Sequence, residues 1–239
     1  MKKLAVAMVA GLASQSLFAD FSVSSTAFEN EKFLPSQFAY CKSAPNGEAE
    51  MSQDISPPLS WSGAPKGTQS FAVITRDPDA VNAPFFNLPG KTIPENFQRV
   101  TVYHWVLVNI PATITSLPEK VGSAGFVIGG KPVGKTPYGL TGENVYSGFL
   151  SSPLAERAKF GANANKDLSG TYGNYDGPCP PWNDLRVHGY EYTVYALDVE
   201  KLNLPEDGHF TGEQAIAAMQ NHILAQATLV GKYTTNKAF

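Results

Sequence analysis

The chain has 239 residues, of which 43% are hydrophobic and 16% charged, a composition that supports a substantial core and excludes a disordered or low-complexity protein. Its formal net charge is −3, and without a basic excess the chain is a poor candidate for binding nucleic acid through phosphates. Glycine (21 residues) and proline (18 residues) interrupt the sequence often, which favours short elements joined by ordered loops.

The first nineteen residues have the pattern of a secretory signal peptide. Lys2 and Lys3 form a cationic start, Leu4–Ala13 is almost wholly apolar, and the segment ends on Ala19, a small residue suited to cleavage. The apolar stretch is too short to span a bilayer, and no later stretch of the sequence is long enough. We therefore predict an exported protein, periplasmic or secreted, with one domain over residues 20–239.

Three segments have the composition of buried strands. Residues 71–75 and 102–110 are rich in β-branched and aromatic side chains and are followed by Pro78 and Pro111. Residues 190–198 alternate along the chain with the period of two that a strand requires. These segments predict a mainly β domain.

One segment near the C-terminus has the pattern of a helix. Thr211 and Gln214 form a capping box, the usual start of a helix. The apolar positions that follow recur at spacings of three and four: Ile216, Met219, Ile223 and Ala227. We predict a helix that begins after Thr211 and continues towards Gly231.

Two long, loop-rich excursions separate these elements, Val81–Arg99 and Ser147–Asn174. Ordered loops of that length usually serve function or contacts between copies of a chain. A homodimer is therefore left open. The sequence has no internal repeat and no linker that would divide it.

The sequence has two cysteines, Cys41 and Cys179. In an exported chain this number favours one disulfide, and the alternative is two separate buried thiols. Cys179 lies between Pro178 and Pro180. We expect it to form a disulfide rather than to act as a nucleophile, which would need a neighbouring base.

Residues 129–136 match the phosphate-binding pattern G-x-x-x-x-G-K-T. Pro132 removes one backbone donor from such a loop, and Pro137 prevents Thr136 from opening a regular helix. We therefore do not expect a nucleotide site. Other catalytic motifs, G-x-S-x-G and H-E-x-x-H, are absent from the sequence, and His209 and His222 are interpreted as solvated or partly buried polar residues.

The remaining chemistry-bearing residues lie near the ends of the predicted strands. Asp77 and Asp79 follow the first strand, and His104 stands within an apolar run. A buried imidazole needs a hydrogen-bond partner, so His104 alone fits either a satisfied core histidine or a site residue. If His104 converges with His188, Tyr190 and nearby backbone N–H groups, the result is a small pocket for a phosphate or carboxylate.

Five short motifs follow one another along the chain. They are Ser56–Trp61 (SPPLSW), Asp77–Ala80 (DPDA), His104–Pro111 (HWVLVNIP), Gly177–Pro181 (GPCPP), and His188–Tyr190 with Tyr195–Asp198 (YALD). In this order the motifs resemble those of the phosphatidylethanolamine-binding protein family, in an exported member of its bacterial, Raf-kinase-inhibitor-like branch. The resemblance covers about residues 54–235.

This resemblance implies a mainly β, sandwich-like fold with a large central antiparallel sheet, a C-terminal helix and a small anion pocket at one edge. In that family the pocket binds the phosphate of phospholipid head groups, or other phosphorylated and carboxylate ligands. Several members inhibit kinases or serine carboxypeptidases, so a protein target is expected beside the small anionic ligand. No cofactor, metal, nucleic acid or membrane span is implied.

The motifs also assign residues to the pocket. The ligand-binding set carried over from the family is Asp77, His104, Gly177, Pro178, Cys179, His188 and Tyr190, with Asp79 in a supporting role. The peptide bond between Asp77 and Pro78 becomes a candidate for the cis form. A disulfide between Cys41 and Cys179 would lie near the site.

This sequence departs from the family pattern at two places. The segment Val81–Arg99 is longer than in the shorter members and lies between two pocket motifs, so we expect it to narrow or cover the mouth. Val102 stands where some eukaryotic members have a tryptophan, which weakens the case for phospholipid specificity.

Two classes of function follow from these residues. In the first, a binding or regulatory protein, His104, His188 and Tyr190 donate to an anion while Asp77 holds an imidazole in position. Affinity would then rise between about pH 7.5 and 5.5, as imidazole gains its proton. In the alternative, an exported hydrolase, Asp77, His104 and His188 bind a metal or act as acid and base.

Overall fold

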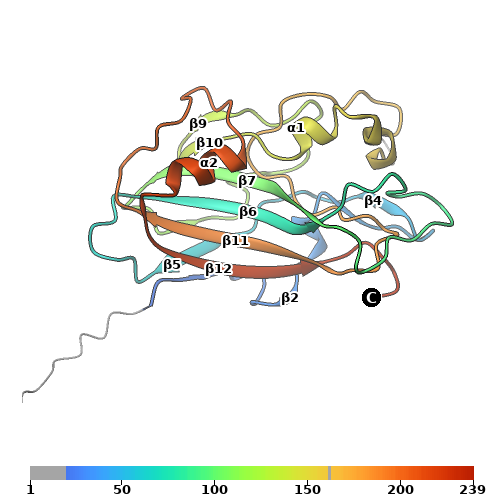
Figure 1. Ribbon diagram of the computed structural model, residues 1–239, viewed down its shortest axis with the longest axis horizontal. Helices are drawn as coiled ribbons and strands as arrows, with labels where there is room; N and C mark the ends of the chain where they lie inside the picture. Colours follow the sequence, from blue (N-terminus) through green and yellow to red (C-terminus); the bar gives the residue numbers. More distant parts are fainter. Residues whose placement is uncertain (1–19, 161–162) are drawn as a thin grey trace, which may run out of the picture.

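The computed structural model describes residues 20–160 and 163–239, so the predicted signal segment lies outside the described residues. The centre of the molecule is a seven-stranded sheet in the order β2-β12-β11-β6-β7-β10-β9 (Figure 1). The long strands are β6 (Ser70–Ala80), β7 (Val100–Pro111), β11 (His188–Leu197) and β12 (Ile223–Tyr233). The short strands at its edges are β2 (Lys32–Phe33), β9 (Gly134–Thr136) and β10 (Gly139–Thr141).

The predicted strands are confirmed, and each is longer than its sequence pattern indicated. Neighbouring strands of the large sheet are antiparallel except β2, which pairs parallel to β12 at the edge. A second sheet has three strands, β1 (Ser22–Ser24), β5 (Leu59–Ser62) and β8 (Ser116–Leu117), and a hairpin joins β3 (Cys41–Ser43) to β4 (Ala49–Met51). The expected mainly β, sandwich-like architecture is therefore confirmed, with a mixed central sheet.

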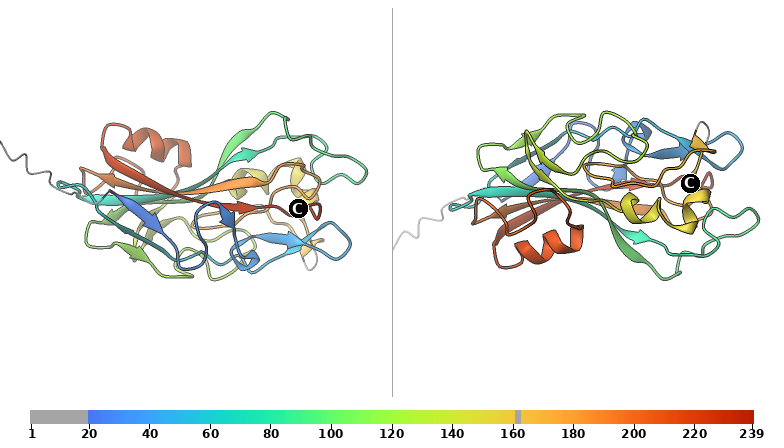
Figure 2. Two further views of the ribbon diagram at one scale, coloured as in Figure 1. Left: turned by 90° about the horizontal axis from the view of Figure 1, so that it is seen from below. Right: turned by 90° about the horizontal axis from the view of Figure 1, so that it is seen from above.

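The two faces of the central sheet bury separate cores because side chains alternate along each strand. On one face, Phe71 and Val73 of β6 pack with Leu59 and Trp61 of the three-stranded sheet. On the other face, side chains of β6 and β7 pack against helix α2 (Gly212–Met219). Figure 2 shows α2 and the three-stranded sheet on opposite sides of the central strands.

The helix predicted near the C-terminus is confirmed at its start and wrong at its end. Thr211 and Gln214 form the expected capping box, but α2 ends at Met219. The chain turns there and continues as β12, which pairs with β11 along its whole length, from Leu197 opposite Ile223 to His188 opposite Tyr233. Pairing along a central strand overrides the spacing of three and four that had suggested a longer helix.

Short helices and loops complete the molecule beyond the end of the sheet where β6 finishes. They include η1 (Ser36–Phe38), α1 (Tyr146–Phe149) and η2 (Pro153–Ala158). A third apolar cluster fills this region, with Tyr40, Phe86 and Tyr172 among its members. None of the described helices is long and apolar enough to cross a membrane.

The peptide bond between Asp77 and Pro78, a candidate for the cis form, is trans. No peptide bond among the described residues is cis, and β6 runs through Pro78 to Ala80. The pairing between β6 and β7 shifts register between Asp77 and Ala80. A proline is tolerated at such an irregularity because its missing N–H interrupts no regular ladder there.

Candidate ligand-binding site

A cavity of about 100 Å³ lies at the end of the central sheet where β6 finishes and β7 and β11 begin. The antiparallel order brings these strand ends together, although their residues are far apart in the sequence. The polar side chains in its wall belong to Asp77, His104, Tyr146, His188 and Tyr190. Most of the remaining wall is apolar: Ala80, Val81, Phe86, Val102, Val145, Phe149, Ala158, Pro180 and Pro181.

Five of the seven residues expected to bind the ligand line this cavity: Asp77, His104, Cys179, His188 and Tyr190. Gly177 and Pro178 are not in its wall and instead hold the loop behind it. The Gly177 amide donates to Asp54 Oδ1 at 2.7 Å, and its carbonyl accepts from the Tyr146 hydroxyl at 3.0 Å. The Pro178 carbonyl accepts from the Cys41 amide at 3.3 Å.

His104 is buried in β7, with one ring nitrogen occupied. Its Nδ1 lies 2.8 Å from the backbone carbonyl oxygen of Asp176. The rings of Tyr146 and Tyr190 meet the imidazole edge to face, at centroid distances of 5.8 and 5.3 Å. Burial lowers the pKa of His104 below its ordinary value of 6.5 despite the nearby Asp77 carboxylate. The ring is therefore neutral at neutral pH.

His188 has both ring nitrogens bound to carboxylates. Nδ1 lies 2.8 Å from Asp77 Oδ2, and Nε2 lies 3.1 Å from Asp184 Oδ2. Burial alone would lower its pKa, but the two carboxylates outweigh that effect and raise the pKa of His188 to about 9. His188 is thus a buried imidazolium at neutral pH. The expectation that it donates to an anion does not fit this geometry, because neither N–H is free.

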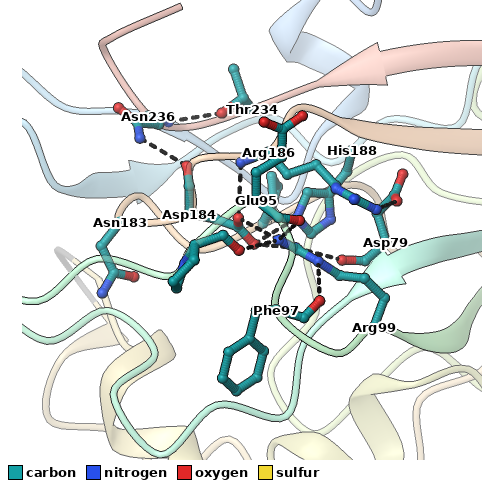
Figure 3. A network of polar contacts seen from close by, with 12 residues as sticks. Asp79, Glu95, Phe97, Arg99, Asn183, Asp184, Arg186, His188, Thr234 and Asn236 are labelled. Atoms are coloured by element: carbon teal, nitrogen blue, oxygen red, sulfur yellow. Dashed lines mark hydrogen bonds and ion pairs between the residues drawn. The ribbon is translucent and has the colours of Figure 1, made fainter.

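Arg99 completes this polar network, and Figure 3 shows its guanidinium and the His188 ring both directed at the carboxylate of Asp184. Its guanidinium donates to the two carboxylate oxygens of Asp184 at 2.6 and 3.0 Å and to the Asp79 carbonyl at 3.0 Å. Such a bidentate pair is the strongest form of ionic hydrogen bond in proteins. Arg99 ends the long excursion that began at Val81, so this pair anchors the excursion beside the cavity.

Asp79 supports the site through the backbone and through Arg186. Its carboxylate accepts from Arg186 Nη1 at 2.9 Å and from the Gly189 amide at 3.0 Å, and its own amide donates to Asp77 Oδ1 at 2.7 Å. Asp79 therefore fixes the start of β11 and the position of Asp77. It does not contact either histidine through a hydrogen bond within the described residues.

A second buried charge cluster lies behind His104. Lys131 Nζ donates to Asp54 Oδ2 at 2.9 Å and also to Asp176 Oδ1. Asn144 Nδ2 donates to the other carboxylate oxygen of Asp176 at 2.8 Å. All four side chains are buried, so the cluster holds the backbone of residues 176–177 on which His104 depends.

Sequence reasoning missed both networks. Arg99, Asp184 and Lys131 lie outside the five motifs, and the approach of one charge to another across long loops leaves no periodic signal. Lys131 belongs to the apparent phosphate-binding pattern, but the lysine that would contact phosphate there is Lys135. The side chain of Lys135 is exposed and pairs with Glu206 at 2.8 Å. A β-hairpin follows Thr136 where the pattern needs a helix, so residues 129–136 do not have the structure of a phosphate-binding loop.

The long excursion contributes to the cavity wall. Val81 and Phe86 line it, and the ring of Phe86 meets Phe149 edge to face at 5.6 Å between centroids. Val102, which stands in place of the tryptophan of some relatives, also lines it. The excursion therefore contributes apolar side chains to the cavity wall, and its expected effect on the mouth stays a prediction.

The predicted disulfide is confirmed. Cys41 and Cys179 are bonded, with a Cα–Cα distance of 5.0 Å. Cys179 lines the cavity and Cys41 belongs to β3. The bond thus ties the pocket loop to the hairpin of β3 and β4.

The arrangement of Asp77, His104 and His188 bears on the alternative of a metal-dependent or acid-base hydrolase. Among residues 20–160 and 163–239, no group of three or more histidine, cysteine, aspartate and glutamate side chains could hold a metal ion. The carboxylates occupy both nitrogens of His188, so this ring has no lone pair for a metal and no free site for proton transfer. The geometry of His188 therefore does not fit the role that the hydrolase alternative gives it.

Comparisons with known proteins agree with the motif order. The family model for phosphatidylethanolamine-binding protein (PEBP) matches residues 24–234. A UPF0098 protein from Methanothermobacter thermautotrophicus is 33% identical over 181 residues, which cover 76% of this chain and 83% of that protein. The UPF0098 protein YbcL from Escherichia coli is 30% identical over 180 residues, which cover 75% and 72%.

Solved structures give the same result. The crystal structure of Escherichia coli YbcL, described as a new member of the mammalian PEBP family, matches with a TM-score of 0.58 and 26% identity over 90% of this chain and 99% of that one. A putative PEBP homologue from Chlamydia trachomatis matches with a TM-score of 0.55 and 25% identity, covering 89% of this chain and 96% of that one. The chain belongs to the phosphatidylethanolamine-binding protein family.

Proposed function

We propose that this protein is an exported binding protein whose cavity takes a small anionic group, from a phosphate, a phospholipid head group or a carboxylate. The observation that carries the proposal is a small group of polar side chains, with His104 and Tyr190 beside the Asp77–His188 ion pair, in a cavity whose other walls are mostly apolar. Specific small-ligand sites have this composition, in which a few polar groups orient a ligand that apolar walls exclude from water.

Hydrogen bonds rather than salt bridges would hold the anion. No lysine or arginine in the described part of the chain lines the cavity, and the charge of His188 is already shared between two carboxylates. The donors that remain are the amide of Cys179, the single backbone N–H in Pro178–Pro181, and the Tyr190 hydroxyl. Burial, the nearby Asp77 carboxylate and a hydrogen bond to it raise the pKa of Tyr190, so this hydroxyl would turn from Asp77 to the ligand. Among the described residues no oxygen accepts the amide proton of Cys179. We therefore expect modest affinity that depends little on salt.

The expected rise in affinity between about pH 7.5 and 5.5 needs revision. Burial lowers the pKa of His104, so this ring gains its proton below the ordinary value of 6.5. The carboxylates raise the pKa of His188 to about 9, so this ring keeps its charge throughout that range. His188 therefore does not change its charge over the interval. We expect any rise in affinity caused by His104 to occur at lower pH than for an exposed histidine.

Export and a regulatory role belong to the same proposal. Export is supported by the N-terminal pattern of Lys2–Ala19 together with the disulfide between Cys41 and Cys179. In a regulatory role, the protein would inhibit a target such as a kinase or a peptidase, and the cavity would bind an anionic group of that target, such as a C-terminal carboxylate. Fractionation of cells that express the full chain tests export, and a cytoplasmic product of full length would contradict it.

Titration with inorganic phosphate tests the anion site directly. Tyr190→Phe removes one hydroxyl and keeps the ring, so we expect about three- to tenfold weaker binding by calorimetry or NMR. Tyr195→Phe is the matched control, because Tyr195 belongs to the same strand but packs in the core on the other face of the sheet. Equal affinity in both variants would contradict the assignment of this cavity.

A further inference from the structure

The hydrogen bond of His104 fixes which of its ring nitrogens carries the proton. A backbone carbonyl can only accept, so Nδ1, at 2.8 Å from the Asp176 oxygen, must be the N–H. A neutral imidazole has one N–H, and Nε2 is therefore a lone pair that can only accept. The buried cluster of Lys131, Asp54 and Asn144 holds Asp176 in place, so this tautomer is built into the fold.

Nε2 is the atom of His104 that remains for a ligand. No hydrogen bond to it occurs within residues 20–160 and 163–239, and it is not among the fully buried polar atoms that lack a partner. It therefore retains accessible surface on a residue that lines the cavity. The floor of the cavity presents an acceptor here, where an anion would need a donor.

The groups around His104 do not alter this arrangement near neutral pH. The titratable groups that face it are Asp77 on β6, His188 and Tyr190 on β11, Tyr146 on α1, and Asp54 and Asp176 from the loops. Asp77 is occupied by the His188 imidazolium and by the Asp79 amide. Burial lowers the pKa of His104, which keeps its ring neutral.

We infer that the cavity selects an anion that still carries a proton, namely hydrogen phosphate or a singly protonated phosphate monoester, whose P–OH donates to Nε2 of His104. This inference rests on the anion-binding function proposed above. The unprotonated oxygens of the same ligand accept from the Tyr190 hydroxyl and the Cys179 amide. A ligand without a proton would place an oxygen lone pair against the lone pair of Nε2, which is repulsive.

The inference separates ligands of similar shape. Inorganic phosphate carries at least one proton throughout the neutral range, and a phosphate monoester keeps its last proton up to a pKa of about 6. Sulfate and phosphodiesters carry no proton near neutral pH, and carboxylates lose theirs near pH 4. Free phosphate and monoesters are therefore favoured over the diester of a phospholipid head group.

Calorimetry or NMR titration of the intact protein with four small probes tests this selection. The probes are inorganic phosphate, sulfate, methyl phosphate and dimethyl phosphate, each at pH 6 and pH 8. We expect sulfate and dimethyl phosphate to bind at least about tenfold more weakly than inorganic phosphate. Methyl phosphate should lose roughly 50-fold in affinity from pH 6 to pH 8, as its singly protonated form falls from about half to about a hundredth.

A variant distinguishes the role of Nε2 from a general effect of the cavity. His104→Gln places a carboxamide, which both donates and accepts, near the position of Nε2, so we expect the preference for phosphate over sulfate to disappear. His209→Gln changes a surface histidine that pairs with Glu143, and the preference should persist in this control. If His104→Gln does not fold, the comparison of the four probes on the unmodified protein still decides the question.

The outcomes separate this inference from the proposed function. Sulfate binding as tightly as phosphate would overturn the inference and leave the anion site standing, because His104 would then take up a proton to become a donor. Methyl phosphate binding equally at pH 6 and pH 8 would overturn it in the same way. If none of the four probes binds, the proposed function fails as well.

Discussion

At the scale of single residues, His188 combines a positive charge with complete burial. Such an ion is stable only if its partners supply more energy than the loss of water costs. Asp77 and Asp184 lie on opposite sides of the ring, and Arg99 balances the second carboxylate. The imidazolium of His188 therefore stabilises the fold and has no free N–H for a ligand.

This arrangement predicts that stability falls as the solution becomes alkaline. The carboxylates raise the pKa of His188 from 6.5 to about 9 in the folded protein. A raised pKa contributes stability that is fully present below pH 6.5 and is lost as pH rises through 9. We expect the free energy of unfolding, measured by urea denaturation, to fall by on the order of 3 kcal/mol across this window.

Two variants test whether His188 causes this decrease of the unfolding free energy with pH. In His188→Gln the loss between pH 6.5 and pH 9 should disappear, although the variant is less stable overall because Asp77 and Asp184 lose a partner. His222→Gln is the control, because His222 pairs with Asp198 near the surface, and it should keep the slope. A flat profile in the unmodified protein would show that His188 is not a buried cation.

Predictability at this scale depends on whether a residue belongs to a motif. The order of the motifs brings Asp77, His104 and His188 to one place, because each lies near the end of a strand. The hydrogen bonds of each ring nitrogen could not be predicted, since Asp184 and Asp176 reach them from loops with no periodic pattern. The role expected for His188 changed for that reason alone.

At the scale of elements, strands were easier to predict than the boundary between helix and strand. β6 and β7 are continuous apolar runs because both of their faces are buried. Residues 223–231 fit both a helical spacing and an alternating one. Their pairing with β11 decides between the two, and a local pattern does not contain that pairing.

Gly231 offers a test of β12 as a packed strand. A Cβ at this position would lie 2.6 Å from Leu34 Cγ, and Leu34 is buried. We expect Gly231→Ala to cost about 1–3 kcal/mol of unfolding free energy through overpacking. Gly148→Ala is the matched control, since a Cβ there meets nothing within 4 Å and α1 should tolerate it or gain slightly. Equal stability of the two variants would contradict the packing of β12.

At the scale of the whole molecule, one covalent bond joins the first quarter of the chain to the pocket loop. Cys41 and Cys179 are 138 residues apart in sequence, so the bond closes a long loop in the unfolded chain. We expect Cys41→Ser with Cys179→Ser to lower the free energy of unfolding by about 2–5 kcal/mol. Denaturation of the oxidised protein with and without reductant gives an independent measurement, and no change in either experiment would contradict the prediction.

The central sheet also constrains how the length of this chain can change. Side chains of β6 enter two cores in alternation, with Phe71 and Val73 on one face and Ala72 and Ile74 on the other. Inserting or deleting a single residue within β6 would exchange its two faces and disturb both cores at once. Differences in length among relatives should therefore collect in excursions such as Val81–Arg99, where they alter the wall of the cavity while the sheet stays in register.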